Sequence, residues 1–209
     1  MREAKSFMRL GILGGTFDPV HYGHLLLAEC CRERCRLDRV WFMPTAVPPH
    51  KQANAITPAQ HRVEMLSLAI AGNASFEVSC YEIDKGGVNY TVETLAHLRE
   101  KDPSRDLFFL MGGDSLVDLP TWREPARICQ LATLVVVRRS GLAELDFDAL
   151  TGILSPPQIE TMRQHVVEMP RIDLRARAIR GLVAAGQSIR YRTPRAVEKY
   201  IETHGLYRP

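Results

Sequence analysis

The chain has 209 residues, 45% of them hydrophobic, so it can bury an ordinary core without disulfides or a structural metal. Its 27 basic and 24 acidic residues give a net charge of +3 and are spread along the chain, which excludes a typical nucleic-acid-binding protein. The five irregularly spaced cysteines argue against a secreted disulfide scaffold, and no apolar run is long enough to cross a membrane. We therefore expect one cytoplasmic domain over residues 8–209, a flexible segment 1–7, and a small anionic substrate.

The first half of the chain alternates short apolar runs with amphipathic segments. Strands are predicted over Met8–Leu13, Arg39–Met43 and Phe76–Ile83. Helices are predicted over Leu25–Arg36 and Thr57–Ile70, the second with Pro58 at its first helical position. The first strand is expected to end in a turn at Gly14–Gly15, and prolines after Met43 predict an irregular loop.

The second half continues this alternation. Strands are predicted over Asp106–Met111, closed by a turn at Gly112–Asp114, and over Leu134–Val137. The predicted helices are Thr91–Arg99, Pro156–Gln164, Ala176–Ala185 and Pro194–His204. Such alternation favours an α/β fold, a Rossmann-like doubly wound parallel sheet flanked by helices, with a small C-terminal helical part at about 174–209. Ligands of such folds bind at the carboxyl ends of the strands.

The loop that follows the first predicted strand carries the chemistry. Gly14 and Gly15 allow close approach of an anion to the backbone, and His21 and His24 fall where the next helix should begin. A dinucleotide-binding oxidoreductase is disfavoured because Met43–Pro44 stands where the acidic ribose ligand is needed. A zinc site is disfavoured for want of further ligands. A phosphate site is the better interpretation.

Residues 14–24 resemble the Gly-Gly-Thr-Phe-Asp-Pro and His-x-Gly-His motifs of the nucleotidyltransferase superfamily. Within it, the chain from about Leu10 to Tyr207 is similar to the nicotinate-nucleotide adenylyltransferase family. The segments that carry this resemblance are Pro48–Lys51, Asn89–Leu95, Gly112–Asp114 and Leu119–Trp122. The resemblance implies that the 5′-phosphate of nicotinate mononucleotide attacks the α-phosphorus of ATP, giving deamido-NAD and pyrophosphate.

The resemblance also implies residue roles. His21, His24 and Arg180 are expected to be catalytic, by stabilising charge on the phosphates. Contacts to ATP are expected from Gly14, Gly15, Thr16, Phe17, His24, Gly112, Asp114, Arg138, Arg175, Arg177 and Arg180. Contacts to nicotinate mononucleotide are expected from Thr16, His50, Lys51, Tyr90, Thr91 and Trp122. Trp122 offers a flat face to the pyridine ring, and the turn at Tyr90 and Thr91 offers donors to its carboxylate. Mg²⁺ is expected to arrive on the ATP phosphates, without side-chain ligands.

The clearest departure from the family pattern lies at Leu174–Arg180. Arg175 and Arg177 stand where the family usually has a serine and a threonine that hold the ATP phosphates. Two hypotheses remain open: the guanidinium groups replace the hydroxyls, since arginine binds phosphate bidentately, or they point to solvent and the site is weakened. The cysteines at 30, 31 and 35 do not form a zinc set and are expected to be buried free thiols.

Two other functions remain to be weighed. One is another adenylyl- or cytidylyltransferase of the same fold, which would share only the first loop. The other is a nucleotide-binding protein without turnover, which the departure at Arg175 and Arg177 keeps open. ATP and nicotinate mononucleotide are the expected partners, nucleic acid and membranes are not, and the oligomeric state is left open, a homo-oligomer included.

Overall fold

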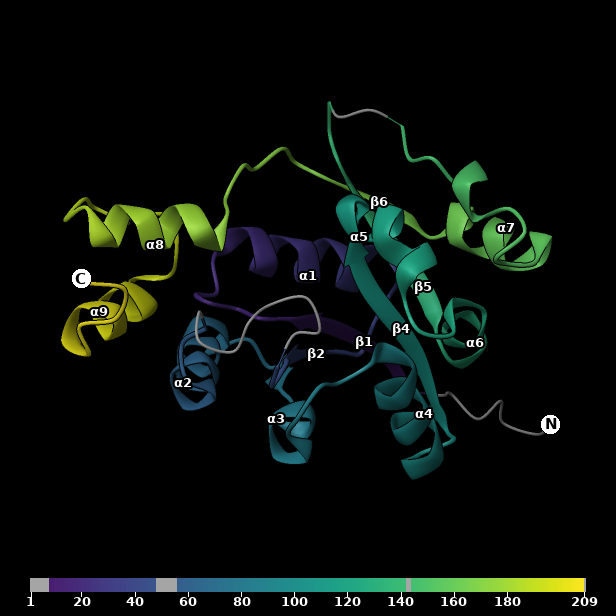
Figure 1. The fold of residues 1–209 in the computed structure, drawn as a ribbon, viewed down its shortest axis with the longest axis horizontal. Helices are drawn as coiled ribbons and strands as arrows, with labels where there is room; N and C mark the ends of the chain where they lie inside the picture. Colours follow the sequence, from purple (N-terminus) through teal and green to yellow (C-terminus); the bar gives the residue numbers. More distant parts are fainter. Residues whose placement is uncertain (1–7, 48–55, 142–143, 209) are drawn as a thin grey trace.

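The computed structural model describes residues 8–47, 56–141 and 144–208, and within them a six-stranded parallel sheet forms the centre of the molecule (Figure 1). The strand order is β3-β2-β1-β4-β5-β6. The strands are β1 (Met8–Gly15), β2 (Arg39–Pro44), β3 (Phe76–Val78), β4 (Arg105–Gly112), β5 (Thr133–Arg139) and β6 (Val166–Met169). This confirms the predicted α/β doubly wound fold.

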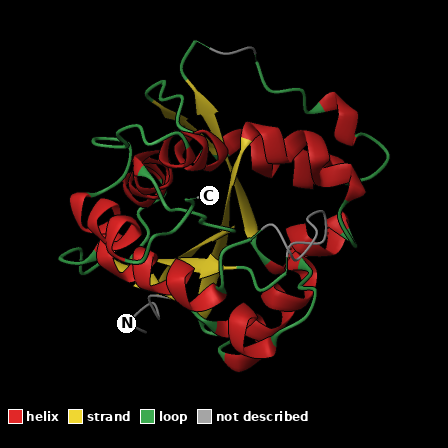
Figure 2. Ribbon diagram, turned by 60° about the vertical axis from the view of Figure 1, so that its left-hand side comes forward, coloured by secondary structure: helices red, strands yellow, loops and turns green. Residues whose placement is uncertain are grey.

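Helices cover both faces of the sheet, as Figure 2 shows. One face carries α1 (Tyr22–Arg34), α2 (Ala59–Ile70), α8 (Ala176–Ala184) and α9 (Arg195–Thr203). The other carries α3 (Tyr81–Lys85), α4 (Thr91–Lys101), α5 (Gly113–Asp118), α6 (Pro125–Leu131) and α7 (Pro156–Gln164). Short 3-10 turns occupy Leu119–Thr121 and Asp148–Leu150. No helix within the described ranges is long and apolar enough to span a membrane.

The strand residues alternate between two apolar cores, because successive side chains of a strand point to opposite faces. Leu10 and Ile12 of β1 face the core beneath α4 to α7, whereas Leu13 faces the core beneath α1, α2, α8 and α9. Gly11 lies on the second face at the point of closest packing. A Cβ atom there would meet Leu37 Cδ1 at 2.7 Å and Val40 Cγ2 at 3.2 Å, so the segment after α1 packs closely against the sheet at this glycine.

Three sequence predictions differ from the structure. The strand predicted over Phe76–Ile83 stops at Val78, and the short helix α3 follows it, with Tyr81 stacked on His97 of α4 at 4.3 Å. This strand lies at the sheet edge, where only β2 pairs with it. The short elements β6 and α6 are not predicted from the sequence. Helix α1 begins at Tyr22, three residues before its predicted start at Leu25. Strand ends and short elements depend on tertiary contacts more than on local pattern.

The predicted glycine turns are also wrong in detail. Gly14 and Gly15 continue β1 and pair with Met43 and Pro44 of β2, and the left-handed residue is Phe17, with φ of 49°. Gly112 ends β4 and α5 begins directly at Gly113. Close packing constrains Gly15, whereas a Cβ atom on Gly112 would meet nothing within 4 Å. A Cβ atom on Gly15 would lie 3.1 Å from the Phe17 ring.

Candidate nucleotide-binding site

A pocket of about 480 Å³ opens at the carboxyl ends of β1, β4 and β5, where the strand order changes direction. A doubly wound sheet is expected to bind its ligand there. The walls are partly apolar, from Leu27, Val117, Leu145, Met169, Ile172 and Leu174. The polar residues are His21, His24, Asp114, Arg138 and Arg139, with Gly112 and Gly113 at the base of α5. Sequence analysis had predicted five of these seven polar and glycine positions.

The two histidines form a stacked pair at the start of α1. Their rings lie 3.7 Å apart at an interplanar angle of 19°. The backbone N–H of His21, the N-cap residue, donates to Nδ1 of His24 at 3.3 Å. Since this contact uses the Nδ1 lone pair, it assigns the proton of neutral His24 to Nε2. His24 can therefore donate one hydrogen bond from Nε2 to an anion.

Burial and charge keep both histidines neutral. Burial, with the positive charge of Arg139, lowers the pKa of His21 to about 4. Burial, with the His21 ring and Arg139, holds the pKa of His24 well below its usual range. Nδ1 of His21 is buried without a hydrogen-bond partner in the described structure. A neutral imidazole acts on a phosphate as a hydrogen-bond donor, and an arriving anion would favour its protonation.

Gly23, between the two histidines, is required by the ring of His21. A Cβ atom at this position would lie 3.0 Å from His21 Nδ1 and 3.8 Å from Leu174 Cβ. Leu174 immediately precedes Arg175, the N-cap of α8. The N-termini of α1 and α8 therefore meet at the same pocket wall. Two helix N-termini supply free N–H groups and positive dipole ends, which favour phosphate binding.

Arg175 and Arg177 extend from the start of α8 toward solvent. The side chain of Arg175 is 74% exposed and its Nε donates to Asp173 at 3.2 Å. Arg177 is exposed as well. Neither residue lines the pocket as the described chain forms it. In this conformation the two side chains flank the predicted phosphate site without closing over it.

Adjacent arginines at the end of β5 face different partners. Arg138, predicted as an ATP ligand, lines the pocket but its guanidinium pairs with Glu144 and Glu168. Arg139 lines the same pocket, and its charge acts on both histidines. Sequence analysis missed Arg139, because two consecutive arginines on a strand cannot be assigned to a face without knowing which neighbours each one meets.

Arg180 lies behind the loop, not in the pocket lining. Its Nη1 donates to the carbonyl oxygen of Asp18 at 2.6 Å and lies 4.0 Å from the Asp18 carboxylate. Asp18 is 3% exposed, and its carboxylate also accepts from the backbone N–H of Thr57 and from the hydroxyl of Tyr207. Sequence analysis missed Asp18, Tyr207 and the buried Arg62 as parts of this site. Their partners are distant in sequence, so no local pattern reveals them.

Three of the six predicted nicotinate residues, Tyr90, Thr91 and Trp122, lie on the other face of the sheet. Tyr90 is the N-cap of α4 and Thr91 its first residue, so the helix N-terminus supplies the donors expected for a carboxylate. Trp122 is partly buried, and its ring meets Phe109 edge to face at 5.9 Å. A Cβ atom on Gly14 would contact the same Phe109 ring at 3.8 Å. Phe109 thus joins the glycine loop to Trp122.

A cation lies over this second group of residues. The guanidinium of Arg123 is 4.9 Å from the centroid of the Tyr90 ring. Glu93 of α4 accepts from both Arg123 at 2.7 Å and Lys85 at 2.8 Å. Arg123 also lies 3.8 Å from Glu124, so the cations and carboxylates beside the start of α4 largely compensate one another. The donors available to an anionic ring substituent are therefore the free backbone N–H groups at the start of α4.

The remaining predicted positions have simple placements. Asp114 lies exposed in the first turn of α5, at the pocket edge. The carbonyl oxygen of Thr16 accepts from Arg62. His50 and Lys51 lie outside the described residues. All five cysteines are free thiols, as expected, and burial raises the pKa values of Cys30, Cys31 and Cys35. No group of metal-ligating side chains occurs in the ranges that the structure covers.

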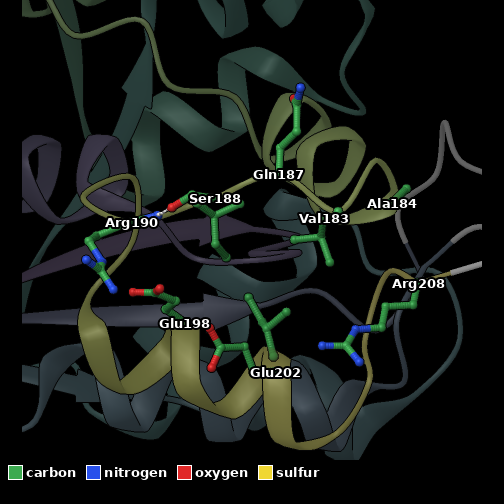
Figure 3. A pocket seen from close by; sticks show the side chains of 11 residues that line it. Val183, Ala184, Gln187, Ser188, Arg190, Glu198, Glu202 and Arg208 are labelled. Atoms are coloured by element: carbon green, nitrogen blue, oxygen red, sulfur yellow. Dashed lines mark hydrogen bonds between the residues drawn. The ribbon is translucent and has the colours of Figure 1, made fainter.

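A second hollow, of about 690 Å³, lies between the C-terminal end of α8 and α9 (Figure 3). Arg190 and Arg208 face Glu198 and Glu202 across it, so its charges largely compensate one another. None of the predicted site residues lines it. The hollow between the strand ends is therefore the better candidate for a nucleotide site.

Comparisons with known proteins identify the family of the chain and its fold. The cytidylyltransferase-like family model matches residues 12–181. A probable nicotinate-nucleotide adenylyltransferase of Thermomicrobium roseum is 47% identical over 96% of this chain and 92% of its own. A probable nicotinate-nucleotide adenylyltransferase of a Roseiflexus species is 47% identical over 95% of this chain and 98% of its own. A Plasmodium falciparum nicotinic acid mononucleotide adenylyltransferase, solved in complex with NaAD, shares the fold, with a TM-score of 0.74 at 16% identity over 95% of this chain and 97% of that one.

Proposed function

The chain belongs to the nicotinate-nucleotide adenylyltransferase family, and from that premise we propose that it transfers the adenylyl group of ATP to nicotinate mononucleotide, a step of NAD biosynthesis. The observation that carries the proposal is the pairing of two sites across one sheet edge. His21 and His24 lie between two helix N-termini, and Trp122 lies beside the start of α4. The first suits a polyphosphate and the second an anionic aromatic ring.

The reaction needs alignment more than proton transfer. An oxygen of the nicotinate mononucleotide 5′-phosphate attacks the α-phosphorus of ATP, the bond from that phosphorus to the β-phosphate bridging oxygen breaks, and pyrophosphate leaves with both electrons. The attacking phosphate is already ionised, so no general base is required. The Nε2–H of His24, the α1 N-terminus and Arg139 would stabilise the charge that develops on the α-phosphate and leaving group.

Magnesium fits this site as a companion of ATP. Asp114 is the one carboxylate among the described residues that line the pocket, and the described chain has no metal-ligating cluster. Mg²⁺ usually keeps several waters and binds through one or two carboxylates plus substrate phosphates. Bound in this way, it would neutralise phosphate charge, and Asp114 is the lining side chain that would help to hold it. The free thiols are also consistent with a reducing, cytoplasmic compartment.

The test is pyrophosphate release by the purified protein with Mg-ATP and either nicotinate or nicotinamide mononucleotide. We expect release with both ATP and the acid substrate present, and a clear preference for the acid over the amide. No release with either substrate would contradict the enzyme assignment and leave a nucleotide-binding protein. A preference for the amide would contradict the role of the α4 N-terminus, and release with other phosphorylated acceptors would point to another transferase of this fold.

A further inference from the structure

The backbone of the nucleotide loop is strained at Phe17, immediately before Asp18. Phe17 has φ of 49°, a left-handed conformation that is strained for a bulky residue and persists only where its surroundings impose it. Its ring is 2% exposed and packs between Gly15 and His24, with 5.0 Å between the Phe17 and His24 ring centroids. The strained residue therefore sets the position of the His24 ring.

The N-terminal side of Phe17 is held by a buried arginine. Arg62 of α2 is 1% exposed, and its Nη1 donates to the carbonyl oxygen of Thr16 at 2.8 Å. Its Nε donates to the carbonyl oxygen of Thr57 at 2.9 Å. A buried guanidinium that donates to backbone carbonyls in two separate segments fixes both of them. Arg62 thus anchors the loop from within the fold.

The C-terminal side of Phe17 is held by the last part of the described chain. The hydroxyl of Tyr207 donates to Oδ1 of Asp18 at 2.7 Å, across 189 residues of sequence. Arg180 donates to the carbonyl oxygen of the same residue at 2.6 Å, and the Thr57 N–H donates to Oδ2 at 3.2 Å. Burial and the neighbouring Asp18 carboxylate raise the pKa of Tyr207, so the phenol stays a donor at neutral pH.

Two more contacts from the C-terminal segment follow along the loop. The hydroxyl of Thr193 donates to the carbonyl oxygen of Val20 at 2.8 Å, and the N–H of Tyr22 donates to the carbonyl oxygen of Arg192 at 3.2 Å. Residues 18–22, which lead into the histidine pair, are therefore fastened by α8, by the connection to α9 and by Tyr207. None of the residues that make these contacts lines the pocket that the two histidines line.

We infer that Tyr207 is a positioning residue for ATP: through Asp18 it holds the strained Phe17 backbone and so the His21–His24 pair. The inference rests on the proposed function for its substrate, and it concerns only the ATP side. Tyr90, Thr91 and Trp122 belong to other elements, and within the described structure they form no hydrogen bond or ring contact with Tyr207 or Asp18. Loss of the Tyr207 hydroxyl should therefore affect ATP and spare nicotinate mononucleotide.

The experiment removes one hydroxyl at a time. Tyr207→Phe is compared with Tyr200→Phe, a matched control on α9. The Tyr200 hydroxyl donates to Glu64 of α2 at 2.5 Å and not to a residue of the nucleotide loop. Mg-ATP affinity is measured by calorimetry, well below the thermal midpoint of each variant, and the Michaelis constants of both substrates are measured alongside. We expect Tyr207→Phe to weaken Mg-ATP binding about tenfold, as loss of a hydrogen bond to a charged group implies.

The outcomes separate the two proposals. Support requires a weakened ATP affinity in Tyr207→Phe, a nicotinate mononucleotide Michaelis constant within about twofold of wild type, and no ATP effect in Tyr200→Phe. Equal ATP affinity in wild type and a folded Tyr207→Phe overturns the inference, as does an equal loss for both substrates. If Tyr207→Phe does not fold, Asp18→Asn decides by the same criteria. Wild-type protein that binds ATP but releases no pyrophosphate contradicts the proposed function alone.

Discussion

The two halves of the candidate site are built in different ways. The phosphate half joins the loop at residues 14–24 to α2, α8 and Tyr207, through partly buried hydrogen bonds between segments far apart in the sequence. The nicotinate half is assembled within residues 81–123, from the start of α4, Trp122 and a surface ion-pair group around Glu93. Coupling of the first half to the global fold should make it rigid, whereas the second half can adjust locally.

The difference also appears in charge. The histidines of the phosphate half are neutral because burial and Arg139 oppose their protonation. The nicotinate half keeps exposed, fully charged groups, Lys85 and Arg123, against Glu93. A polyphosphate brings its own charge to the first half, while the second half must attract a single carboxylate from water. Substitutions in the two halves should therefore differ in size and in the substrate they affect.

The largest effect is expected from His24→Ala. Loss of one preorganised donor to a developing oxyanion typically costs about 10²- to 10³-fold in kcat. We expect a fall in kcat of this size, measured as pyrophosphate release at saturating substrates, with an unchanged circular dichroism spectrum. His204→Ala, on a histidine that stacks on Tyr200 near the end of α9, is the control and should retain wild-type turnover. A near-normal kcat in His24→Ala would contradict a catalytic role for the His21–His24 pair.

Acidification should destabilise the protein through His21. The folded-state pKa is about 4 and the unfolded value is about 6.5, so between these values the unfolded chain binds more protons. The contribution of His21 to the free energy of unfolding is fully present above about pH 6.5. It is lost as the pH drops toward 4, by roughly 3 kcal/mol in all. The free energy of unfolding, measured by urea titration at pH 7, 6 and 5, should show this fall. His21→Asn should show a shallower pH slope, and an unchanged slope would contradict burial as the cause.

Gly23→Ala should reduce activity by overpacking. The new Cβ atom would lie 3.0 Å from His21 Nδ1, so the ring must move. Overpacking costs about 1–3 kcal/mol, which corresponds to about tenfold or more in kcat/KM for ATP. The matched control is Gly181→Ala in α8, where a Cβ atom meets nothing within 4 Å and helix propensity improves. If Gly23→Ala has wild-type kcat/KM, the glycine is not needed to seat the histidine.

The comparison also explains which parts could be predicted from sequence. The sheet and the locations of His21, His24 and Trp122 follow from apolar runs, helix starts and short motifs, which are local. The Tyr207–Asp18 bond and the place of Arg139 beside Arg138 in the pocket lining depend on which distant segments meet. Local patterns carry no information about such partners. The glycines illustrate the limit: the sequence shows where they are, but not that Gly15 and Gly23 are confined by the rings of Phe17 and His21.

Trp122→Leu should affect the nicotinate half alone. The ring offers a stacking face, and loss of such stacking typically costs about 1–3 kcal/mol, so we expect the nicotinate mononucleotide Michaelis constant to rise about tenfold. The ATP Michaelis constant should stay within about twofold, since Trp122 reaches the glycine loop only through Phe109. Trp41→Leu, on a tryptophan whose N–H donates to Glu77 of β3, serves as control. Equal changes for both substrates would show that the two halves act as one.

The smallest effect is expected from removing Arg175 and Arg177 together. Arg175 is 74% exposed and paired with Asp173, and Arg177 is exposed too, so each guanidinium acts through solvent. Exposed charges contribute about 0–1 kcal/mol, which predicts a rise in the ATP Michaelis constant of about threefold in Arg175→Ala/Arg177→Ala. Arg127→Ala, an exposed arginine of α6, is the control. A rise above about tenfold, abolished in high salt, would instead mean that these side chains fold over the triphosphate and replace the family's hydroxyls. The N-terminus of α8 would then bind ATP through side chains as well as through its backbone N–H groups.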